Sequence, residues 1–215
     1  MKRCFIFSAG SFFGLRETPG PGDTVIAADA GLLHCRRAGI KPGLVVGDFD
    51  SMPPPEDATL DILRLPVEKD DTDTMMAVKL GLQRGCREFF IYGGTGGKRL
   101  DHTLANIQSL AYLCRHGARG YMYDDDFVYT VLENGALDIE KAVDWGLVSI
   151  FSLGDRVENV TLEGLQYPLE NGVVENSFPI GVSNHITAPS ARISAGAGLL
   201  LVGWELPAHS RSEDE

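Results

Sequence analysis

The first half of the sequence alternates short apolar runs with segments of helical periodicity, and this alternation constrains the fold more than any other feature. The apolar runs that read as strands are residues 4–7, 24–28, 44–46, 62–67 and 88–92. Helices are expected at residues 30–38, from about 72 to 84, and at 101–116. Strands that alternate with helices in this way form a mostly parallel sheet, so the pattern predicts an α/β domain.

The second half has a different character, because helical periodicity disappears after Tyr123. Strands are expected at residues 127–132, 146–151, 160–162, 172–174 and 199–202. Turn signals at residues 134–135 (Asn-Gly) and 171–172 (Asn-Gly) lie between some of them. We therefore predict an N-terminal α/β domain at residues 1–125, closely joined to a C-terminal all-β sandwich domain at residues 126–215 that ends in a short polar tail.

The composition argues against several classes of function. The chain has 215 residues, a formal net charge of −11 and a pI near 4.9, and it contains no basic run, so a nucleic-acid partner is not expected. No apolar run approaches the ~20 residues that span a bilayer, and the first strand is too short for a secretory signal. The four cysteines form no CxxC pair and read as reduced thiols, so a cytoplasmic location is expected.

Acidic residues and a glycine-rich run follow several of the predicted strands. Asp29 follows the second strand, Asp48 and Asp50 follow the third, and an acidic run at residues 70–73 follows the fourth. A glycine-rich run at residues 93–97 follows the fifth. Because ligands of parallel sheets bind beyond the carboxyl ends of the strands, we expect these groups to meet at one edge of the sheet, although they lie far apart in the sequence.

The acidic run before the second helix has more carboxylates than capping requires. Thr72 suits the N-cap, and one or two acidic residues beside it are ordinary. Asp70, Asp71 and Asp73 would repel each other unless a cation lies among them, and hard cations prefer oxygen ligands. The two aspartates after the third strand, at a spacing of two, turn to the same side of an extended segment. The pattern predicts a Mg²⁺ ion that also binds substrate phosphates; the alternatives are plain helix capping and a solvated turn.

The run GGTGG at residues 93–97 predicts a loop that binds anionic oxygens. Around Gly94, Thr95 and Gly96 the backbone can approach a ligand closely, and its N–H groups, with the following helix N-terminus, can cradle phosphate. The run is not a Walker A loop, because the GK[ST] ending is absent, and it is not GxGxxG; a flexible turn is the alternative. Arg99, just beyond it, provides fork-shaped donors that suit phosphate.

Polar residues of the third predicted helix are further candidates. Asp101 could cap the helix, orient the neighbouring arginine or bind a ribose hydroxyl. His102 and Asn106 are four residues apart and share a helix face, where both are binding candidates. By their local pattern alone, residues 8–10 after the first strand and residues 183–184 in the β domain read as turns.

Together these motifs resemble the thiamine pyrophosphokinase family, of the compact bacterial kind, over nearly the whole chain. The resemblance rests on the order and spacing of residues 28–31, 47–51, 69–74, 93–102, 106, 164–169 and 181–184. It implies that the α/β domain binds ATP and that the β-sandwich helps to bind thiamine, in a homodimer whose active sites are shared between subunits. The implied reaction transfers the terminal pyrophosphoryl group of ATP to the thiamine hydroxyl and releases AMP.

The resemblance also implies roles for residues of this chain. The acidic Mg²⁺ cluster is matched by Asp29, Asp48, Asp50 and Asp73, the nucleotide side by Arg99 and Asp101, and the thiamine side by Ser183 and Asn184. Either Asp71 or Asp73 could accept the hydroxyl proton, and the sequence does not choose between them. One departure is that residues 199–202 are aliphatic where some members carry an aromatic residue that stacks on thiamine, with Trp204 just beyond.

Two other functions could use the same residues. A nucleotide sensor would bind without turnover, and a Mg²⁺-dependent phosphohydrolase would use water in place of thiamine. The β domain separates these hypotheses in principle, since hydrolysis needs no acceptor pocket. The discriminating observation is whether AMP forms from ATP only when thiamine is present.

Overall fold

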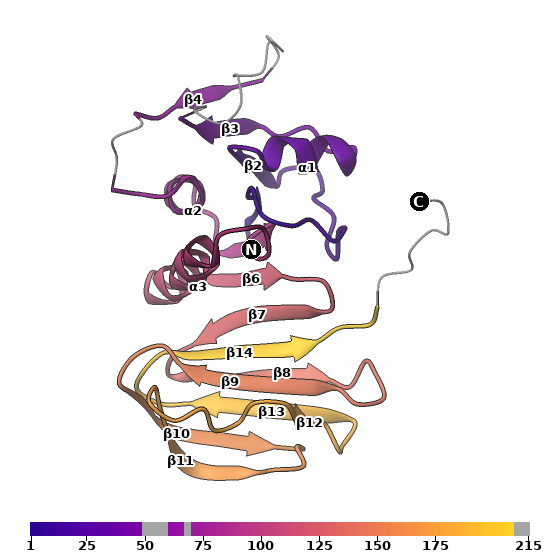
Figure 1. Ribbon diagram of the computed structural model, residues 1–215, viewed down its shortest axis with the longest axis vertical. Helices are drawn as coiled ribbons and strands as arrows, with labels where there is room; N and C mark the ends of the chain where they lie inside the picture. The colour runs from indigo at the N-terminus through magenta and orange to yellow at the C-terminus, as the bar shows by residue number, and fades with distance from the viewer. Residues whose placement is uncertain (49–59, 67–69, 209–215) are drawn as a thin grey trace. The chain divides into compact units, whose positions relative to one another are not determined.

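The computed structural model describes residues 1–48, 60–66 and 70–208 of the chain (Figure 1). The chain divides into two compact units, Met1–Asp124 and Asp125–Glu215, called unit 1 and unit 2 below. Some of the sequence-based expectations lie outside the described residues, namely the position of Asp50, the end of the fourth strand at residue 67, the polar tail from residue 209, and residues 49–51 and 69 of the family motifs.

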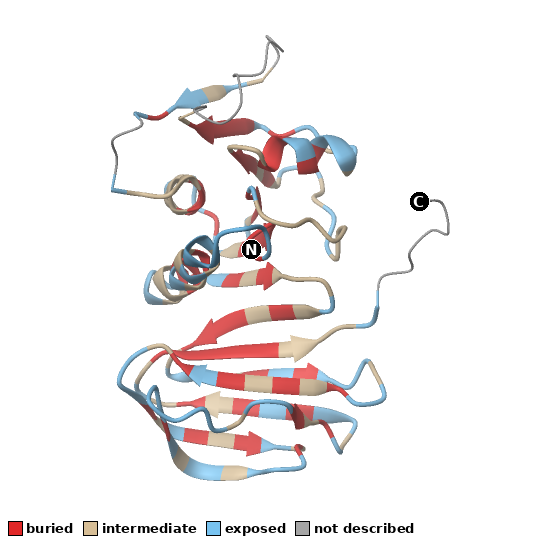
Figure 2. Ribbon diagram, in the orientation of Figure 1, coloured by how far each residue is buried: buried red, intermediate tan, exposed pale blue. Residues whose placement is uncertain are grey.

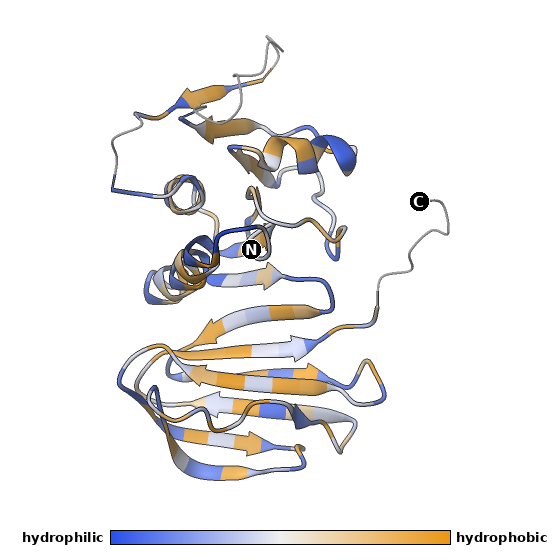
Figure 3. Cartoon of the chain, viewed as in Figure 1, coloured by the Kyte–Doolittle hydropathy of each residue, from blue (hydrophilic) through white to orange (hydrophobic). Residues whose placement is uncertain are grey.

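Six strands of unit 1, within the described residues, run parallel to one another. They are β1 (Arg3–Phe7), β2 (Thr24–Ala28), β3 (Leu44–Gly47), β4 (Ile62–Arg64), β5 (Glu88–Tyr92) and β6 (Arg119–Tyr123). Their order is β6-β5-β1-β2-β3-β4, and every neighbouring pair is parallel. β3 is apolar and buried along its length, as expected for a strand covered on both faces (Figures 2 and 3).

Two strands of unit 1 differ from the sequence-based expectation. β4 is shorter than the expected residues 62–67, because Leu65 and Pro66 already lie outside it. Proline has no N–H to donate to a sheet ladder, so the strand ends before Pro66. β6 was not expected, because its five residues alternate in burial and include Gly120, which weakens the strand pattern.

Helices cover both faces of this sheet. They are α1 (Gly31–Arg37), α2 (Asp73–Gln83) and α3 (Leu100–Arg115). On one face Phe5 of β1 packs in a core cluster with Leu32 of α1. On the other face α2 lies so close that a Cβ on Gly81 would be 3.0 Å from the Sγ of Cys4. Alternate residues of β1 therefore serve opposite faces. None of the helices in the described part of the chain is long and apolar enough to cross a membrane.

Unit 2 contains two packed antiparallel layers. Its strands are β7 (Phe127–Leu132), β8 (Gly135–Glu140), β9 (Leu147–Ser152), β10 (Arg156–Glu163), β11 (Leu169–Glu175), β12 (Asn184–His185), β13 (Ser190–Ala195) and β14 (Leu200–Glu205). The strand orders are β12-β9-β14-β7 and β11-β10-β13-β8. Ile150 and Val202 from one layer share a core cluster with Val157 and Ile193 from the other. The predicted fold class, a mostly parallel α/β domain followed by an all-β sandwich, is confirmed.

The two Asn-Gly signals of unit 2 have different outcomes. Asn134, at φ +47°, lies in the turn between β7 and β8, as predicted. Asn171, at φ +48°, lies inside β11, where the register with β10 shifts. The prediction of a turn there is wrong, because asparagine tolerates left-handed backbone and thus serves a β-bulge as well as a turn. The sequence also did not predict β8, β12 or β13.

Candidate active site

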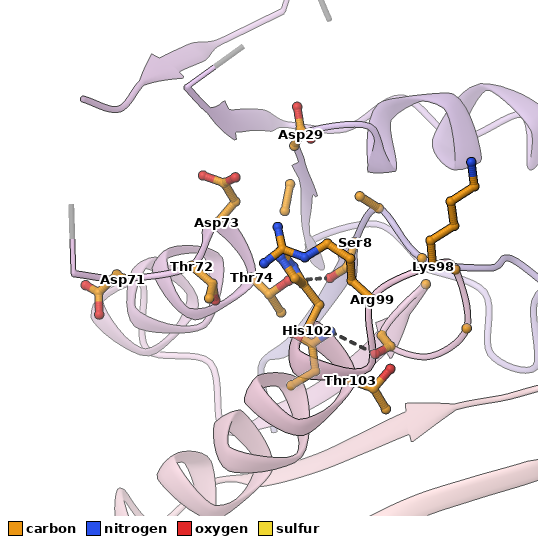
Figure 4. Close-up of a pocket in the computed structure, with 18 of the residues that line it drawn as sticks. Ser8, Asp29, Asp71, Thr72, Asp73, Thr74, Lys98, Arg99, His102 and Thr103 are labelled. Carbon is orange, nitrogen blue, oxygen red and sulfur yellow. Dashed lines mark hydrogen bonds between the residues drawn. The ribbon is translucent and has the colours of Figure 1, made fainter. Parts of the chain in front are cut away.

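The carboxyl ends of β1, β2, β3 and β5 and the N-termini of α2 and α3 line one pocket of about 720 Å³ in unit 1 (Figure 4). This volume is in the range that binds small-molecule ligands. The predicted site residues that line it are Asp29, Asp48, Asp71, Asp73, Gly94, Gly96, Arg99, His102 and Asn106. Thr95 and Asp101 are not among its lining residues, and Ser183 and Asn184 belong to unit 2.

Three aspartates in the pocket lining, Asp29, Asp48 and Asp73, are here called the acidic wall. Asp29 directly follows β2 and adopts left-handed backbone at φ +49°, which is uncommon for a residue with a side chain. Its N–H donates to the carbonyl of Val46 at 2.8 Å, which ties this conformation to the end of β3. Figure 4 shows that Asp29 and Asp73 come from different elements, with Asp73 at the start of α2. Asp29 and Asp48, which follow two separate strands, therefore line one pocket, as the sequence predicted.

The predicted metal cluster is not reproduced as a set of ligands. Within the described residues, no group of three or more His, Cys, Asp or Glu side chains is placed to hold a metal ion. Asp29, Asp48 and Asp73 share the pocket lining, while Asp50 lies outside the described residues. The four-aspartate set therefore stays a prediction.

Asp71 and Asp73, the two candidate bases, have different environments. Both flank Thr72, whose Oγ1 caps α2 by accepting the N–H of Met75 at 3.1 Å. The Asp71 carboxylate accepts hydrogen bonds from Lys79 Nζ at 2.8 and 2.6 Å, and these bonds raise the pKa of Lys79. Figure 4 shows Asp71 directed away from Asp29, unlike Asp73. Asp71 is thus engaged by a cation at the rim of the pocket.

Another part of the lining comes from residues 8–10, 93–94 and 96–97, which belong to two adjacent segments, residues 8–11 and 93–97, here called the glycine wall. The two segments continue the β1–β5 pairing: the N–H groups of Ser8, Gly10 and Ser11 donate at 2.8 Å to the carbonyls of residues 92, 93 and 95. A Cβ on Gly10 would lie 2.3 Å from the Thr95 carbonyl oxygen, so the approach requires glycine.

Side chains from neighbouring elements hold the second segment of the glycine wall. Asn106 of α3 is buried, and its Nδ2 donates to the Gly94 carbonyl at 2.8 Å. The buried Thr95 hydroxyl donates to Asp124 at 2.7 Å. Both residues were predicted as nucleotide contacts, and their hydrogen bonds show that they fix the shape of the loop.

Basic residues follow the glycine wall at the start of α3. Arg99 donates to Asp101 from Nε at 3.2 Å and from Nη2 at 2.5 Å, and both side chains are exposed. These hydrogen bonds lower the pKa of Asp101. The N-cap position of α3 is occupied by Arg99, so Asp101 is not the N-cap residue. Of the alternatives considered for Asp101, the structure therefore favours orientation of Arg99. Figure 4 shows the side chains of Arg99 and Lys98 diverging, with His102 on the next turn.

Several lining residues were missed by sequence reasoning, chiefly residues 8–10, Thr74 and Lys98. Residues 8–10 read as a turn, yet they follow a buried strand as the other loops of the site do, and that position was the available signal. Ser8 and Thr74 are both buried, and their hydroxyl oxygens lie 2.8 Å apart in a hydrogen bond that joins the glycine wall to the start of α2.

The Ser183–Asn184 pair forms a separate feature of unit 2. Asn184 is buried; its Oδ1 accepts from the N–H groups of Tyr167 and His185 at 3.0 Å, and its Nδ2 donates to the Tyr167 carbonyl at 2.8 Å. The Tyr167 side chain is 65% exposed, so the amide clamps the backbone of a loop that presents an aromatic ring to solvent. Ser183 is exposed, at φ +55°.

Carboxylates facing a glycine-lined cradle, with an arginine at a helix start, define a phosphate-handling enzyme of the α/β class. Comparisons with known proteins specify the family. A family model described as thiamin pyrophosphokinase, catalytic domain, matches residues 21–122, and one described as thiamin pyrophosphokinase, vitamin B1 binding domain, matches residues 136–200. The chain belongs to the thiamine pyrophosphokinase family.

Individual relatives agree with this result. Thiamine pyrophosphokinase of Bacillus subtilis is 29% identical over 182 residues, which cover 82% of this chain and 85% of the relative. Its crystal structure has a TM-score of 0.85 at 26% identity and covers 95% of this chain and 99% of that one. A family protein from Enterococcus faecalis has a TM-score of 0.79 at 30% identity, with 95% and 99% covered. The predicted family and its activity, thiamine diphosphokinase, are confirmed; a hydrolase or sensor is not favoured.

Proposed function

We propose that the pocket of unit 1 binds ATP and is where its terminal pyrophosphoryl group passes to the thiamine hydroxyl. The hydroxyl oxygen forms a bond to the β-phosphorus, the bond from that phosphorus to the α–β bridging oxygen breaks, and AMP leaves with that oxygen. The observation that carries this proposal is the meeting of the acidic wall and the glycine wall across one pocket. Such transfer depends on positioning and charge neutralisation more than on covalent help from the protein.

The glycine wall suits the phosphates of ATP. Its backbone can approach the phosphate oxygens, and the N-terminus of α3 points toward the same pocket. Arg99 is paired with Asp101 in an exposed ion pair, and such pairs stabilise little because solvent screens the charges. A multiply charged phosphate can therefore compete for the guanidinium, and Asp101 holds Arg99 near the pocket until it does. In this proposal His102 also contacts the nucleotide.

Asp73 is the better candidate for the base that accepts the hydroxyl proton. Both carboxylate oxygens of Asp71 already accept hydrogen bonds from Lys79, and this side chain is directed away from Asp29. Asp73 is the first residue of α2 and lines the same pocket as Asp29. We therefore assign the proton transfer to Asp73 and a supporting role at the rim to Asp71.

Mg²⁺ fits the donor set of the acidic wall. Asp29, Asp48 and Asp73 offer hard carboxylate oxygens, and Mg²⁺ ordinarily takes one or two protein carboxylates and completes its coordination with water and phosphate oxygens. A three-ligand protein cluster is thus not required for this ion. When bound, Mg²⁺ would neutralise the phosphate charge. Asp50, by the family resemblance, would complete this set.

The acceptor side and the assembly complete the proposal. We propose that Ser183 and the Asn184-clamped loop shape the thiamine site, and that a homodimer shares each site between subunits. Neither a nucleic acid nor a membrane is part of this function. The free thiols suit a reducing compartment, so the cytoplasm is the proposed location.

The reaction is tested with purified protein, ATP, Mg²⁺ and thiamine. AMP and thiamine pyrophosphate are expected in equal amounts, and AMP is not expected without thiamine. Formation of ADP and thiamine monophosphate would refute pyrophosphoryl transfer. AMP formation at the same rate with and without thiamine would instead indicate a hydrolase.

A further inference from the structure

His34 of α1 lies behind the glycine wall and contacts both of its segments. The residue is 8% exposed, and its Nε2 lies 2.9 Å from the Gly10 carbonyl oxygen. Its ring stacks on Phe12, with centroids 5.2 Å apart and an interplanar angle of 19°. Its Cδ2 would be 3.3 Å from a Cβ on Gly93, so the ring also packs against the second segment. No substrate-facing role follows from this position, because His34 does not line the pocket.

The surroundings of His34 determine its tautomer. A carbonyl oxygen can only accept, so Nε2 must carry the proton that is donated to Gly10. Nδ1 is buried and has no hydrogen-bond partner among the described residues. A proton on Nδ1 would therefore be a buried donor without an acceptor, which is unfavourable. Burial accordingly lowers the pKa of His34. The ring is a neutral donor directed at one backbone atom.

The segment that His34 contacts needs an external support. Residues 8–11 offer small side chains, and glycine loses more conformational freedom on ordering than any other residue. The backbone bonds to residues 93 and 95 hold this segment on one side. The hydrogen bond to the Gly10 carbonyl and the stack on Phe12 hold it on the other. A phosphate cradle binds well only if its shape is fixed before the ligand arrives.

We propose that His34 is a positioning residue of this pocket: its Nε2–H bond to Gly10 and its stack on Phe12 hold residues 8–11 in the arrangement that receives the phosphates. The proposal rests on the proposed nucleotide site. It assigns a role to a residue that contacts neither ATP nor thiamine, and it specifies which of the two ring nitrogens matters.

Three substitutions separate the contributions of the ring. His34→Gln places an amide N–H near the position of Nε2, His34→Asn places one near Nδ1, and His34→Leu removes the donor. The matched control is His116→Leu at the end of α3. His116 also bonds a backbone carbonyl, that of Tyr112 at 2.7 Å, and stacks on the same tyrosine, but it is exposed and away from the pocket.

Two readouts are measured: hydrogen exchange of the Gly10 and Ser11 amides without ligand, and the Kd of ATP with Mg²⁺ in the absence of thiamine. With His34→Leu and His34→Asn, exchange at both amides should become roughly tenfold faster and the Kd should rise roughly tenfold. The KM for thiamine should not change. His34→Gln should stay within about threefold of wild type, and His116→Leu should match wild type.

The outcomes distinguish this proposal from the proposed function. If wild type binds no ATP, the nucleotide site itself fails, whatever the amides do. If wild type binds ATP and the Leu and Asn variants bind it equally well, or lose affinity with unchanged exchange at Gly10 and Ser11, the positioning role is overturned. If His34→Leu does not fold, the Gln and Asn variants decide: equal behaviour of the two overturns the proposal.

Discussion

The two walls of the pocket use the chain in opposite ways. In the proposed function, the side chains of Asp29, Asp48 and Asp73 on the acidic wall provide the chemistry. On the glycine wall the backbone provides it, and side chains from behind, such as His34 and Asn106, fix its shape. Substitutions on the first wall should therefore impair the chemical step by changing charge. Substitutions on the second should impair binding by changing shape.

The largest effect is expected from the acidic wall. Asp73→Asn should lower kcat at least about 10³-fold, because in the proposed function Asp73 is both a base and a metal ligand. Asp71→Asn should lower kcat less than about tenfold, because that carboxylate is engaged by Lys79. Steady-state kinetics on both variants, with melting temperatures as the control for folding, test the assignment. Equal inactivity of the two would remove the distinction between them.

Gly10→Ala should give the next largest effect, this time through binding. The added Cβ would lie 2.3 Å from the Thr95 carbonyl, so the two segments of the glycine wall must separate. We expect kcat/KM for ATP to fall about 10²-fold, mostly through KM. Gly43→Ala is the control, since its Cβ would make an ordinary 3.7 Å contact with the Val25 carbonyl oxygen. A loss in kcat alone would show that this wall contributes to chemistry rather than binding.

A smaller effect tests the hydrogen bond that joins the glycine wall to the start of α2. Ser8→Ala and Thr74→Val each leave one buried hydroxyl without its partner, whereas the double substitution removes both. The double variant should therefore be more stable than the sum of the singles predicts, with a coupling of about 1 kcal/mol in the free energy of unfolding. Urea unfolding of the four proteins measures it. Additive losses would mean that the two hydroxyls do not stabilise each other.

The smallest effect concerns pH. Burial lowers the pKa of His34 below its ordinary value of 6.5, and the charge of Arg37 acts in the same direction, against the Gly10 hydrogen bond. The unfolded state then binds more protons as the pH falls through about 6.5, so stability that is fully present above that pH is progressively lost below it. Between about pH 7.5 and 5.5, the free energy of unfolding of wild type should fall more steeply than that of His34→Gln. Parallel curves would contradict the buried neutral ring.

The difference between the two walls also explains which residues of the site could be predicted from the sequence. The carboxylates were found because charged residues after apolar strands stand out, and the strand-end rule brought Asp29 and Asp73 together. Residues 8–10 were missed, because their role depends on pairing with a segment more than eighty residues away. No local pattern reveals such a pairing. Asn184 is the opposite case, because the sequence identified the residue but not its contacts. Its hydrogen bonds to the Tyr167 backbone depend on the tertiary structure.

The strands were predicted better where a continuous apolar run marks them than where only alternate residues are apolar. β2 and β5 have the expected bounds because continuous apolar runs leave little choice. β8 was missed although Leu137 and Ile139 alternate with exposed residues, because the run is short and begins at a glycine. β12 has two residues, too few for any periodicity. The strands that were not predicted are those that form because neighbouring strands pair with them, without a clear pattern in their own sequence.

The left-handed backbone of Asp29 has a consequence for engineering. A glycine there would be favoured by roughly 1 kcal/mol, so any procedure that optimises folding stability alone would tend to replace the aspartate. The replacement would keep the bond to Val46 and lose the carboxylate from the pocket. At position 29, folding stability thus favours glycine whereas the proposed activity requires aspartate. A thermostabilised version of this enzyme should therefore retain Asp29.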